Sequence, residues 1–134
     1  MILGLGIDVA SKERLRAALE RHGESFRERV LTERERLALA SRRDADDALA
    51  GSWAAKEATV KALGGAAAFA WHDIEIARDE GGRPSLDLRG AARAAADRLG
   101  VARAWVSISH DAGVAVAVVV LEGEAPAPPT EERP

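Results

Sequence analysis

The sequence predicts a single α+β domain in which antiparallel strands pack with helices. Apolar residues recur at three- and four-residue spacing over 45–63, which indicates a long helix. Short apolar or alternating segments near 73–89 and 105–121 are joined by turn-forming residues, which indicates hairpins. Helices and hairpins follow one another without a regular strand–helix–strand alternation, so the class is α+β rather than α/β. At 134 residues, one domain is expected.

Composition excludes several classes of protein. The chain has no cysteine, which excludes disulfide scaffolds, thiolate metal sites and thiol nucleophiles and fits a reducing, cytoplasmic location. A net charge of −3 gives no support for nucleic-acid binding. No apolar stretch approaches the length of a membrane span, and Met1-Ile2-Leu3-Gly4 lacks the basic region of a signal peptide. We therefore expect neither a nucleic-acid nor a membrane partner.

The candidate core is thin for a chain that folds alone. The hydrophobic fraction is 47 %, but much of it is alanine, and only five residues are aromatic. A small single domain buries only roughly 60–70 % of its unfolded surface. Oligomerisation is therefore a possibility to be tested from the outset.

The first third of the chain predicts a strand and two helices. Residues 2–9 form an apolar segment that we expect to be a short strand ending at Asp8. Ser11 is a suitable N-cap for one basic helix running to about Arg29. Thr32, followed three residues later by a glutamate, fits a capping box that begins a second, short helix.

The rest of the chain alternates between helices and hairpins. We expect, in order, the long helix 45–63 closed by Gly64-Gly65, strands 73–77 and 85–89 around a polar turn, helix 91–99 stopped by Gly100, and strands 105–109 and 114–121. The segment 123–134 is rich in Pro, Glu and Thr and has little to bury, so we expect it to be disordered.

Two glycines near the N-terminus permit two interpretations. Gly4 and Gly6 after a short apolar run resemble part of a dinucleotide-binding motif, but Val9 stands where the third glycine is needed, so we reject that motif. Alternatively, Gly6 lets another segment approach the backbone. Asp8 is then either a turn former or a free carboxylate at the strand end.

The central helix holds the most informative spacing. Glu57 and Lys61 are four residues apart and lie on one helical face. The simpler interpretation is a solvated ion pair worth roughly 0.3–0.5 kcal/mol. The alternative is a site in which the carboxylate holds Mg²⁺ and the ammonium binds a phosphate. Magnesium takes few carboxylates besides phosphates and water, so Asp8 and Glu57 would suffice.

A Ser-His-Asp run ends the penultimate strand. Ser109, His110 and Asp111 are consecutive, but strand geometry points the first two to opposite faces, so a nucleophilic triad is not supported. A histidine and an aspartate at a turn are either ordinary surface residues or part of a site assembled from other segments.

Taken together, these segments resemble a known family. The segments that carry the resemblance are Gly4-Leu5-Gly6-Ile7-Asp8, Leu31-Thr32-Glu33-Arg34-Glu35, Trp53-Ala54-Ala55-Lys56-Glu57-Ala58 with Lys61, Gly82-Arg83-Pro84 and Val106-Ser107-Ile108-Ser109-His110. They occur in the same order as in holo-(acyl-carrier-protein) synthase, the small stand-alone type of 4′-phosphopantetheinyl transferase. The alanine- and arginine-rich composition is most similar to that of actinobacterial members. The match spans about residues 1–122. Only the tail, 123–134, lies outside it.

The resemblance implies a reaction and a site. The family transfers the phosphopantetheine arm of coenzyme A to a serine of an apo acyl carrier protein and releases adenosine 3′,5′-bisphosphate. By resemblance, Asp8 and Glu57 hold Mg²⁺, and Glu57 is also the candidate to take the serine proton, either directly or through a metal-bound water. Asp111 is a second acid/base candidate. Coenzyme A would be contacted by four residues, namely Lys61, Gly64, Pro84 on the adenine side and His110 at the phosphates.

The resemblance also implies partners. Carrier proteins are acidic around their modified serine, and Arg14 and Arg21 lie two turns apart on one stripe of the first helix. Arg14 falls where the family docks its carrier. The family fold packs an antiparallel sheet against a long helix and forms a homotrimer, with the sheets near the three-fold axis and coenzyme A in clefts between subunits.

Two departures from the family pattern are visible. Ser52 stands where an arginine commonly helps to hold a coenzyme A phosphate, and Arg42, Arg43 and His110 are candidates to replace it. The glycine turn is Gly64-Gly65-Ala66 instead of Gly-Thr-Gly. We expect activity with weaker coenzyme A binding. The alternatives are a non-catalytic module that docks carrier proteins and another Mg²⁺-dependent enzyme acting on a nucleotide pyrophosphate.

Overall fold

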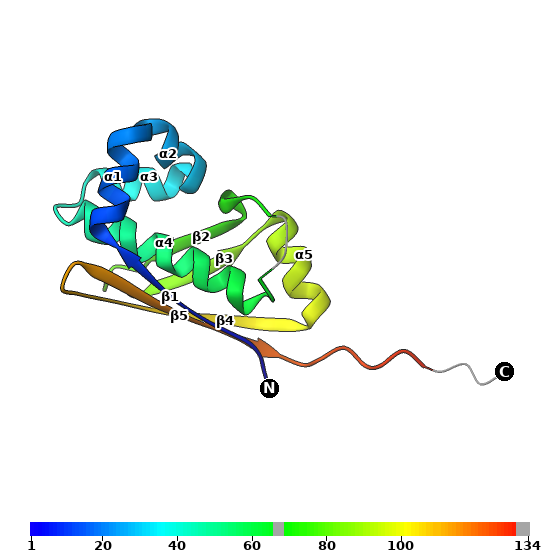
Figure 1. Cartoon of the computed structure of the whole chain (residues 1–134). Helices are drawn as coiled ribbons and strands as arrows, with labels where there is room; N and C mark the ends of the chain where they lie inside the picture. The colour runs from blue at the N-terminus through cyan, green and yellow to red at the C-terminus, as the bar shows by residue number, and fades with distance from the viewer. Residues whose placement is uncertain (66–68, 131–134) are drawn as a thin grey trace.

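Two antiparallel sheets and one long helix organise the computed structural model, which describes residues 1–65 and 69–130 (Figure 1). The larger sheet has the order β1-β5-β4, formed by β1 (Ile2–Ser11), β5 (Val114–Gly123) and β4 (Val101–Asp111). A hairpin of β2 (Ile74–Arg78) and β3 (Pro84–Leu88) forms the second sheet. The predicted α+β class is confirmed.

The helices lie on one side of the larger sheet. The long helix α4 (Ala45–Ala62) crosses that face and packs against β1 and β5, while β2 and β3 lie on its other side (Figure 1). Three short helices gather beyond one end of the sheet, and a fourth follows the hairpin; these are α1 (Lys12–His22), α2 (Glu24–Val30), α3 (Glu33–Ala40) and α5 (Gly90–Leu99). A single 3₁₀ turn, η1 (Trp71–Asp73), precedes β2.

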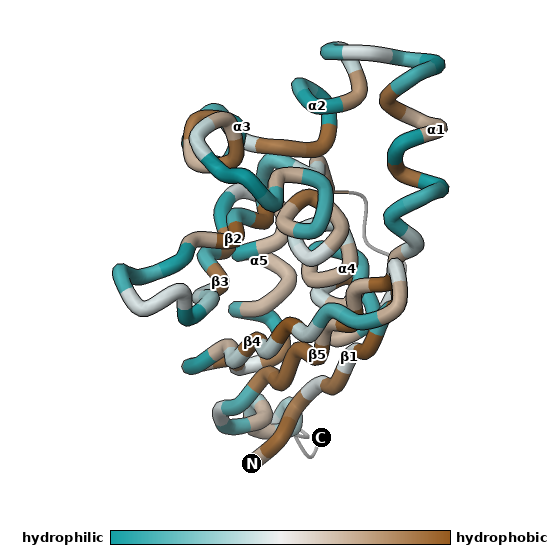
Figure 2. Tube along the Cα trace, turned by 90° about the vertical axis from the view of Figure 1, so that its left-hand side faces the viewer, coloured by the Kyte–Doolittle hydropathy of each residue, from teal (hydrophilic) through white to brown (hydrophobic). Residues whose placement is uncertain are grey.

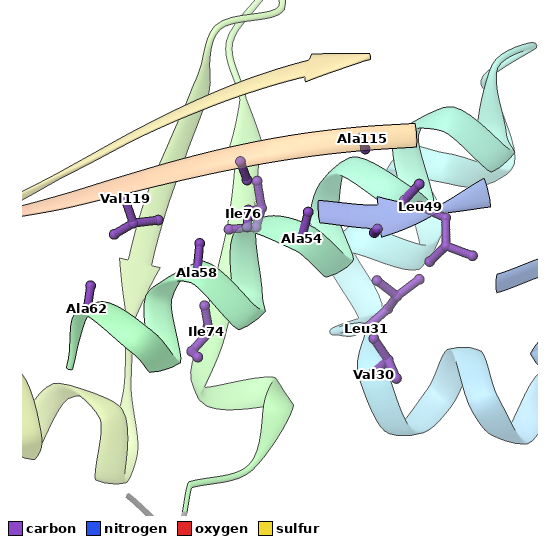
Figure 3. Close-up of a cluster of buried hydrophobic side chains, with 14 of the residues drawn as sticks. Val30, Leu31, Leu49, Ala54, Ala58, Ala62, Ile74, Ile76, Ala115 and Val119 are labelled. Atoms are coloured by element: carbon purple, nitrogen blue, oxygen red, sulfur yellow. The ribbon is translucent and has the colours of Figure 1, made fainter. Parts of the chain in front are cut away.

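Small side chains let α4 lie close to both sheets. Ala54, Ala58 and Ala62 are fully or almost fully buried along the helix, between Val119 of β5 and Ile74 of β2 (Figure 3). Alanine fills little space, so the backbone of α4 approaches the strands closely and the core stays dense. The alanine-rich composition therefore produces a close helix–sheet contact rather than a loose core.

The opposite face of the larger sheet is apolar and exposed. Side chains alternate along each strand, so those that do not face α4 point away from the helices. Leu5, Ile7 and Val9 of β1 and Trp105 of β4 are 45 % or more exposed. In Figure 2 the largely brown strands β1 and β5 form the lower surface of the molecule, on the side opposite α4. Monomeric proteins rarely expose so continuous an apolar surface.

Several predicted boundaries are wrong. The predicted helix from Ser11 to Arg29 is two helices, because Gly23 adopts φ 58° and ends α1. The first strand continues to Ser11, so Asp8 lies inside β1 instead of ending it. The strand predicted at 105–109 is the middle of the longer β4. The capping box at Thr32 and the hairpin around residue 80 are confirmed.

Two predictions concern residues that are wholly or partly undescribed. Ala66 of the altered glycine turn and the last four tail residues, 131–134, lie outside the described residues. Residues 124–130 of the tail form neither helix nor strand. In the ranges 1–65 and 69–130, no helix combines the length and hydrophobicity that crossing a membrane requires.

Candidate active site

Asp8, Glu57 and Lys61 come together where β1 crosses α4. The Lys61 ammonium lies 3.0 Å from Oδ1 of Asp8 and also donates a hydrogen bond to the Ile7 carbonyl oxygen. Lys61 therefore pairs with Asp8 and not, as the simpler interpretation of the helix spacing predicted, with Glu57. The contact joins residues that are 53 positions apart in the chain.

Gly6 allows this contact. A Cβ atom at Gly6 would overlap the carbonyl oxygen of Ala58, and one at Gly4 would overlap that of Ala62. Both glycines lie in β1 and both carbonyls belong to α4, so the strand and the helix touch backbone to backbone. The expectation that Gly6 permits a close approach is confirmed. This contact brings Asp8 within reach of the last turns of α4.

The two carboxylates repel each other. Burial, and then the negative charge of Asp8, raise the pKa of the Glu57 carboxyl above its ordinary value, and Lys61 only partly offsets this. A raised carboxyl pKa next to a second carboxylate marks a place where a cation or a proton is favoured. Within residues 1–65 and 69–130, no cluster of three or more His, Cys, Asp or Glu side chains that could hold a metal ion occurs, so the side chains offer a cation at this point two carboxylates.

A cleft of about 440 Å³ opens beside this cluster, between β1, α1 and α4. Asp8 and Glu57 line it, together with Arg14 of α1 and the apolar side chains of Phe26 and Trp53. The two aromatic rings, one from α2 and one from α4, have centroids 6.1 Å apart. The cleft therefore combines acidic donors, one basic side chain and an apolar wall. Arg21, in the last turn of α1, is exposed and lies outside the cleft lining.

A buried ion pair fixes α4 from its other side. Lys56 has no exposed surface, and its ammonium donates to Glu35 at 2.7 Å and to the carbonyl oxygens of Trp71 and Ile74. Glu35 also accepts from the backbone N–H of Ile76. Burial lowers the pKa of Lys56, and the Glu35 charge opposes that shift.

This role of Lys56 was not predicted from the sequence. Lys56 is the residue before Glu57, so its anchoring sets the rotation of α4 at the candidate site. The available signal was that the helical neighbours of Lys56 carry no charge, since a buried cation among them needs a carboxylate partner from elsewhere in the chain; these neighbours, three and four residues away, are Ser52, Trp53, Thr59 and Val60. Glu35 of the capping box supplies it.

The other predicted site residues do not form one group. Nε2 of His110 donates to the carbonyl oxygen of Asp47 at 2.7 Å, and Gly51 makes room for the ring, since a Cβ there would lie 2.9 Å from Nε2. Asp111 is exposed at the end of β4, with β5 between it and β1. Pro84 begins β3, and Gly64 follows the C-terminus of α4. Gly64 is close to the Asp8–Lys61 pair, because its backbone N–H donates to the Lys61 carbonyl oxygen at 3.1 Å, whereas His110 and Asp111 lie on the strand farthest from β1.

The chain is similar to known proteins over most of its length. Residues 4–119 match the model of the 4′-phosphopantetheinyl transferase superfamily. Over 122 residues the chain is 48 % identical to a holo-(acyl-carrier-protein) synthase of Streptomyces coelicolor, covering 91 % of this chain and 98 % of that protein.

Solved structures show the same fold. A holo-(acyl-carrier-protein) synthase from Neisseria meningitidis superposes with a TM-score of 0.84 at 31 % identity, covering 91 % of this chain and 99 % of that one. The Helicobacter pylori holo-(acyl-carrier-protein) synthase, solved in complex with coenzyme A, gives a TM-score of 0.77 at 32 % identity, covering 88 % and 99 %. The chain belongs to the 4′-phosphopantetheinyl transferase superfamily.

Proposed function

We propose that this protein is a holo-(acyl-carrier-protein) synthase. It transfers the 4′-phosphopantetheine arm of coenzyme A to a serine of an apo acyl carrier protein and releases adenosine 3′,5′-bisphosphate. The observation that carries the proposal is the assembly of Asp8, Glu57 and Lys61 beside an open cleft. Relatives of that name, and a neighbour solved with coenzyme A, support the substrate assignment.

The donor set fits Mg²⁺. Asp8 and Glu57 provide two carboxylates next to each other, and their mutual repulsion favours a cation between them. Magnesium is held in proteins by one or two carboxylates, with the substrate phosphates and water completing its shell. Asp8 and Glu57 would hold the ion, and the chemistry that a bound Mg²⁺ supplies is neutralisation of the pyrophosphate charge.

The side chains of the cleft have different roles in the transfer reaction. In the transfer, the carrier serine Oγ forms a bond to the β-phosphorus. The bond from that phosphorus to the bridging oxygen breaks, and the electron pair leaves with adenosine 3′,5′-bisphosphate. Glu57 accepts the serine proton. Lys61 turns from Asp8 to the phosphates, and Asp111 is the second acid/base candidate.

We infer that three chains assemble around the exposed face of the larger sheet. That face presents Leu5, Ile7 and Val9 beside the valines of β5, and covering it removes a large apolar area from water. Within one chain, His110 of β4 is separated from Asp8 of β1 by β5. A neighbouring subunit brings His110 to the cleft at Asp8, where coenzyme A then lies.

The function is tested by weighing the carrier. Purified protein is incubated with an apo acyl carrier protein, coenzyme A and Mg²⁺, and the carrier is analysed by mass spectrometry. We expect a gain of one phosphopantetheine, and no gain with the Asp8→Ala variant or without Mg²⁺. Excess Mg²⁺ should not restore the variant.

The alternative functions give different results in the same assay. A docking module retains the carrier on a column but leaves its mass unchanged. Another Mg²⁺-dependent pyrophosphate enzyme consumes coenzyme A without modifying the carrier. Either result, obtained with several carriers, would refute the transferase.

A further inference from the structure

Helix α1 has a small apolar attachment to the rest of the protein. Leu15 is the one buried residue among its eleven, all of which the structure describes, and Ala18 and Leu19 are partly buried against the core. Figure 1 shows α1 beyond the end of the larger sheet, beside α2 and α3. A surface helix is normally oriented by a broad apolar stripe. With a single buried leucine, the orientation of α1 depends strongly on its polar contacts.

Two ion pairs connect α1 to the start of α4. The Lys12 ammonium lies 3.1 Å from Oδ1 of Asp47, and Nε of Arg16 donates a hydrogen bond to Oδ2 of Asp46 at 2.8 Å. Lys12 and Arg16 are four residues apart, so they lie on one stripe of α1. The two aspartates are consecutive in the first turn of α4. The pairs therefore lie side by side and fix two points of one helix face.

The aspartates belong to the more rigid side of this contact. The three residues that follow Asp47 in α4 are buried, namely Ala48, Leu49 and Ala50. The backbone carbonyl oxygen of Asp47 also accepts a hydrogen bond from His110 of β4 at 2.7 Å. Negative side chains in the first turn of a helix are favoured by the helix dipole. The first turn of α4 is thus fixed in the core, and the ion pairs position α1 relative to it.

The rotation of α1 about its own axis decides where Arg14 points. Arg14 is two residues from Lys12, which is about 200° around a helix of 3.6 residues per turn. It therefore lies on the opposite side of α1 from the stripe of Lys12 and Arg16, and it lines the cleft beside Asp8. A rotation of the helix would carry Arg14 away from that cleft.

We propose that Asp46 and Asp47 are positioning residues for the carrier protein, because they hold α1 in the rotation at which Arg14 faces the cleft. This proposal rests on the proposed function, in which an acidic carrier protein docks on α1. If the two aspartates acted only as surface charges, their removal would strengthen the binding of an acidic carrier. A positioning role predicts the opposite sign, since the carrier then meets a helix that is no longer held.

Neutralising both aspartates separates the two effects. The test measures the Kd for an apo acyl carrier protein whose acceptor serine is replaced by alanine, by isothermal titration at about 0.15 M salt, where long-range charge effects are screened. Asp46→Asn combined with Asp47→Asn should weaken carrier binding roughly three- to ten-fold, since each exposed ion pair contributes only a small free energy. The Kd for coenzyme A should be unchanged, because the Asp47 carbonyl that His110 contacts belongs to the backbone and is retained.

Hydrogen exchange of the α1 amides measures the positioning directly. In the same variant these amides should exchange roughly three- to ten-fold faster, by the same change in free energy, while those of α5 keep their rates. Asp46→Glu with Asp47→Glu retains both charges and should keep the wild-type carrier Kd and exchange rates. Glu80→Gln with Asp97→Asn removes two negative charges from the β2–β3 turn and α5, and should alter neither the carrier Kd nor exchange in α1.

A mutant cycle shows whether the aspartates act through their partners. Lys12→Met with Arg16→Met breaks the same pairs from the other side, so it should speed exchange in α1 as much as the aspartate variant does. All four substitutions together should give no further increase, because the pairs are then already broken. A tighter or unchanged carrier Kd in the aspartate variant would overturn the proposal, as would unchanged exchange in α1 or equal weakening of carrier and coenzyme A.

Failure of the proposed function has a different signature. A wild type that neither binds nor modifies any apo carrier protein would refute the synthase and the carrier as the partner of α1. Faster α1 exchange in the aspartate variant would then support the attachment of α1 to α4 and nothing beyond it. A wild type that modifies the carrier, together with an aspartate variant that binds it equally tightly, would support the synthase and overturn the positioning role.

Discussion

Glu57 works at a position where its charge is unfavourable. Burial and the Asp8 carboxylate raise its pKa, so the folded protein binds a proton at Glu57 more tightly than the unfolded chain does. Stability contributed by this group therefore falls as the pH rises from the ordinary glutamate pKa through the raised one. At neutral pH the ionised Glu57 side chain therefore destabilises the folded protein when no cation is bound. This is expected of a carboxylate whose function is to bind a cation and accept a proton.

Glu57→Gln should separate stability from activity. The amide removes the unfavourable charge, so we expect a higher Tm than wild type at pH 7 and no difference below about pH 4, where glutamate is protonated in both states. Transfer activity should fall at least roughly 100-fold, because the amide cannot accept the serine proton. Thermal unfolding at several pH values and carrier mass analysis measure the two effects. Glu80→Gln, in the exposed β2–β3 turn, is the control and should show neither.

The ion pairs at the site show what residue spacing can and cannot predict. The four-residue spacing correctly placed Glu57 and Lys61 on one face, and the resemblance correctly selected Asp8 as their neighbour. The spacing could not show that Lys61 prefers Asp8, because that depends on how β1 crosses α4. Lys56 was missed for the same reason. Its partner Glu35 is 21 residues away and is supplied by packing.

At the scale of elements, α4 is held by polar groups on one face and by glycines on the other. The Lys56 ammonium connects it to α3 and to the carbonyl oxygens around β2. Buried ion pairs of this kind contribute little net stability when intact, but leave an uncompensated charge when one partner is removed. Their value here is the fixed orientation of the helix.

Lys56→Met should therefore destabilise the protein by about 3–5 kcal/mol, measured by urea unfolding. Lys12→Met removes a surface pair with Asp47 and should cost less than about 1 kcal/mol. The double variant Lys56→Met with Glu35→Gln should recover part of the loss, because no buried carboxylate is then left ionised without a partner. A loss in Lys56→Met no larger than in Lys12→Met would contradict the anchoring role.

Helix α1 is the element through which the carrier is expected to dock. Arg14 lines the cleft beside Asp8, so a negative side chain there would repel an acidic carrier. Arg14→Glu should raise the carrier KM roughly ten-fold and leave the Kd for coenzyme A unchanged. Arg98→Glu, an equal charge change on α5, should alter neither value. Wild-type kinetics for Arg14→Glu at every carrier concentration would disprove the docking assignment.

Element boundaries were less predictable than element types. Every major helix and strand was expected, because the hydrophobic periods are clear. The break at Gly23 was missed since its neighbours continue a helical pattern and only the positive φ reveals the turn. The start of β4 was missed because Ala102 and Ala104 are poor indicators of a strand.

At the scale of the molecule, the exposed sheet face is expected to hold three chains together. Ile7 is 57 % exposed at the centre of β1, opposite Val118. Ile7→Asp places a charge in the proposed interface, and sedimentation should show monomers where the wild type gives trimers, with transfer activity lost in parallel. Leu37→Asp replaces a similarly exposed residue of α3, outside the sheet, and should leave the trimer intact. A monomeric wild type would refute the assembly.

The close contact of β1 with α4 also restricts how the sequence can vary. No side chain fits between Gly6 and the Ala58 carbonyl, so substitution there must part the strand from the helix and carry Asp8 away from Lys61. In a saturation library selected for synthase activity, position 6 should therefore return glycine almost alone. Position 2, a more exposed site on the same strand, should accept many residues. The positions of Asp8 and Lys61 relative to each other thus depend on Gly6, a residue without a side chain.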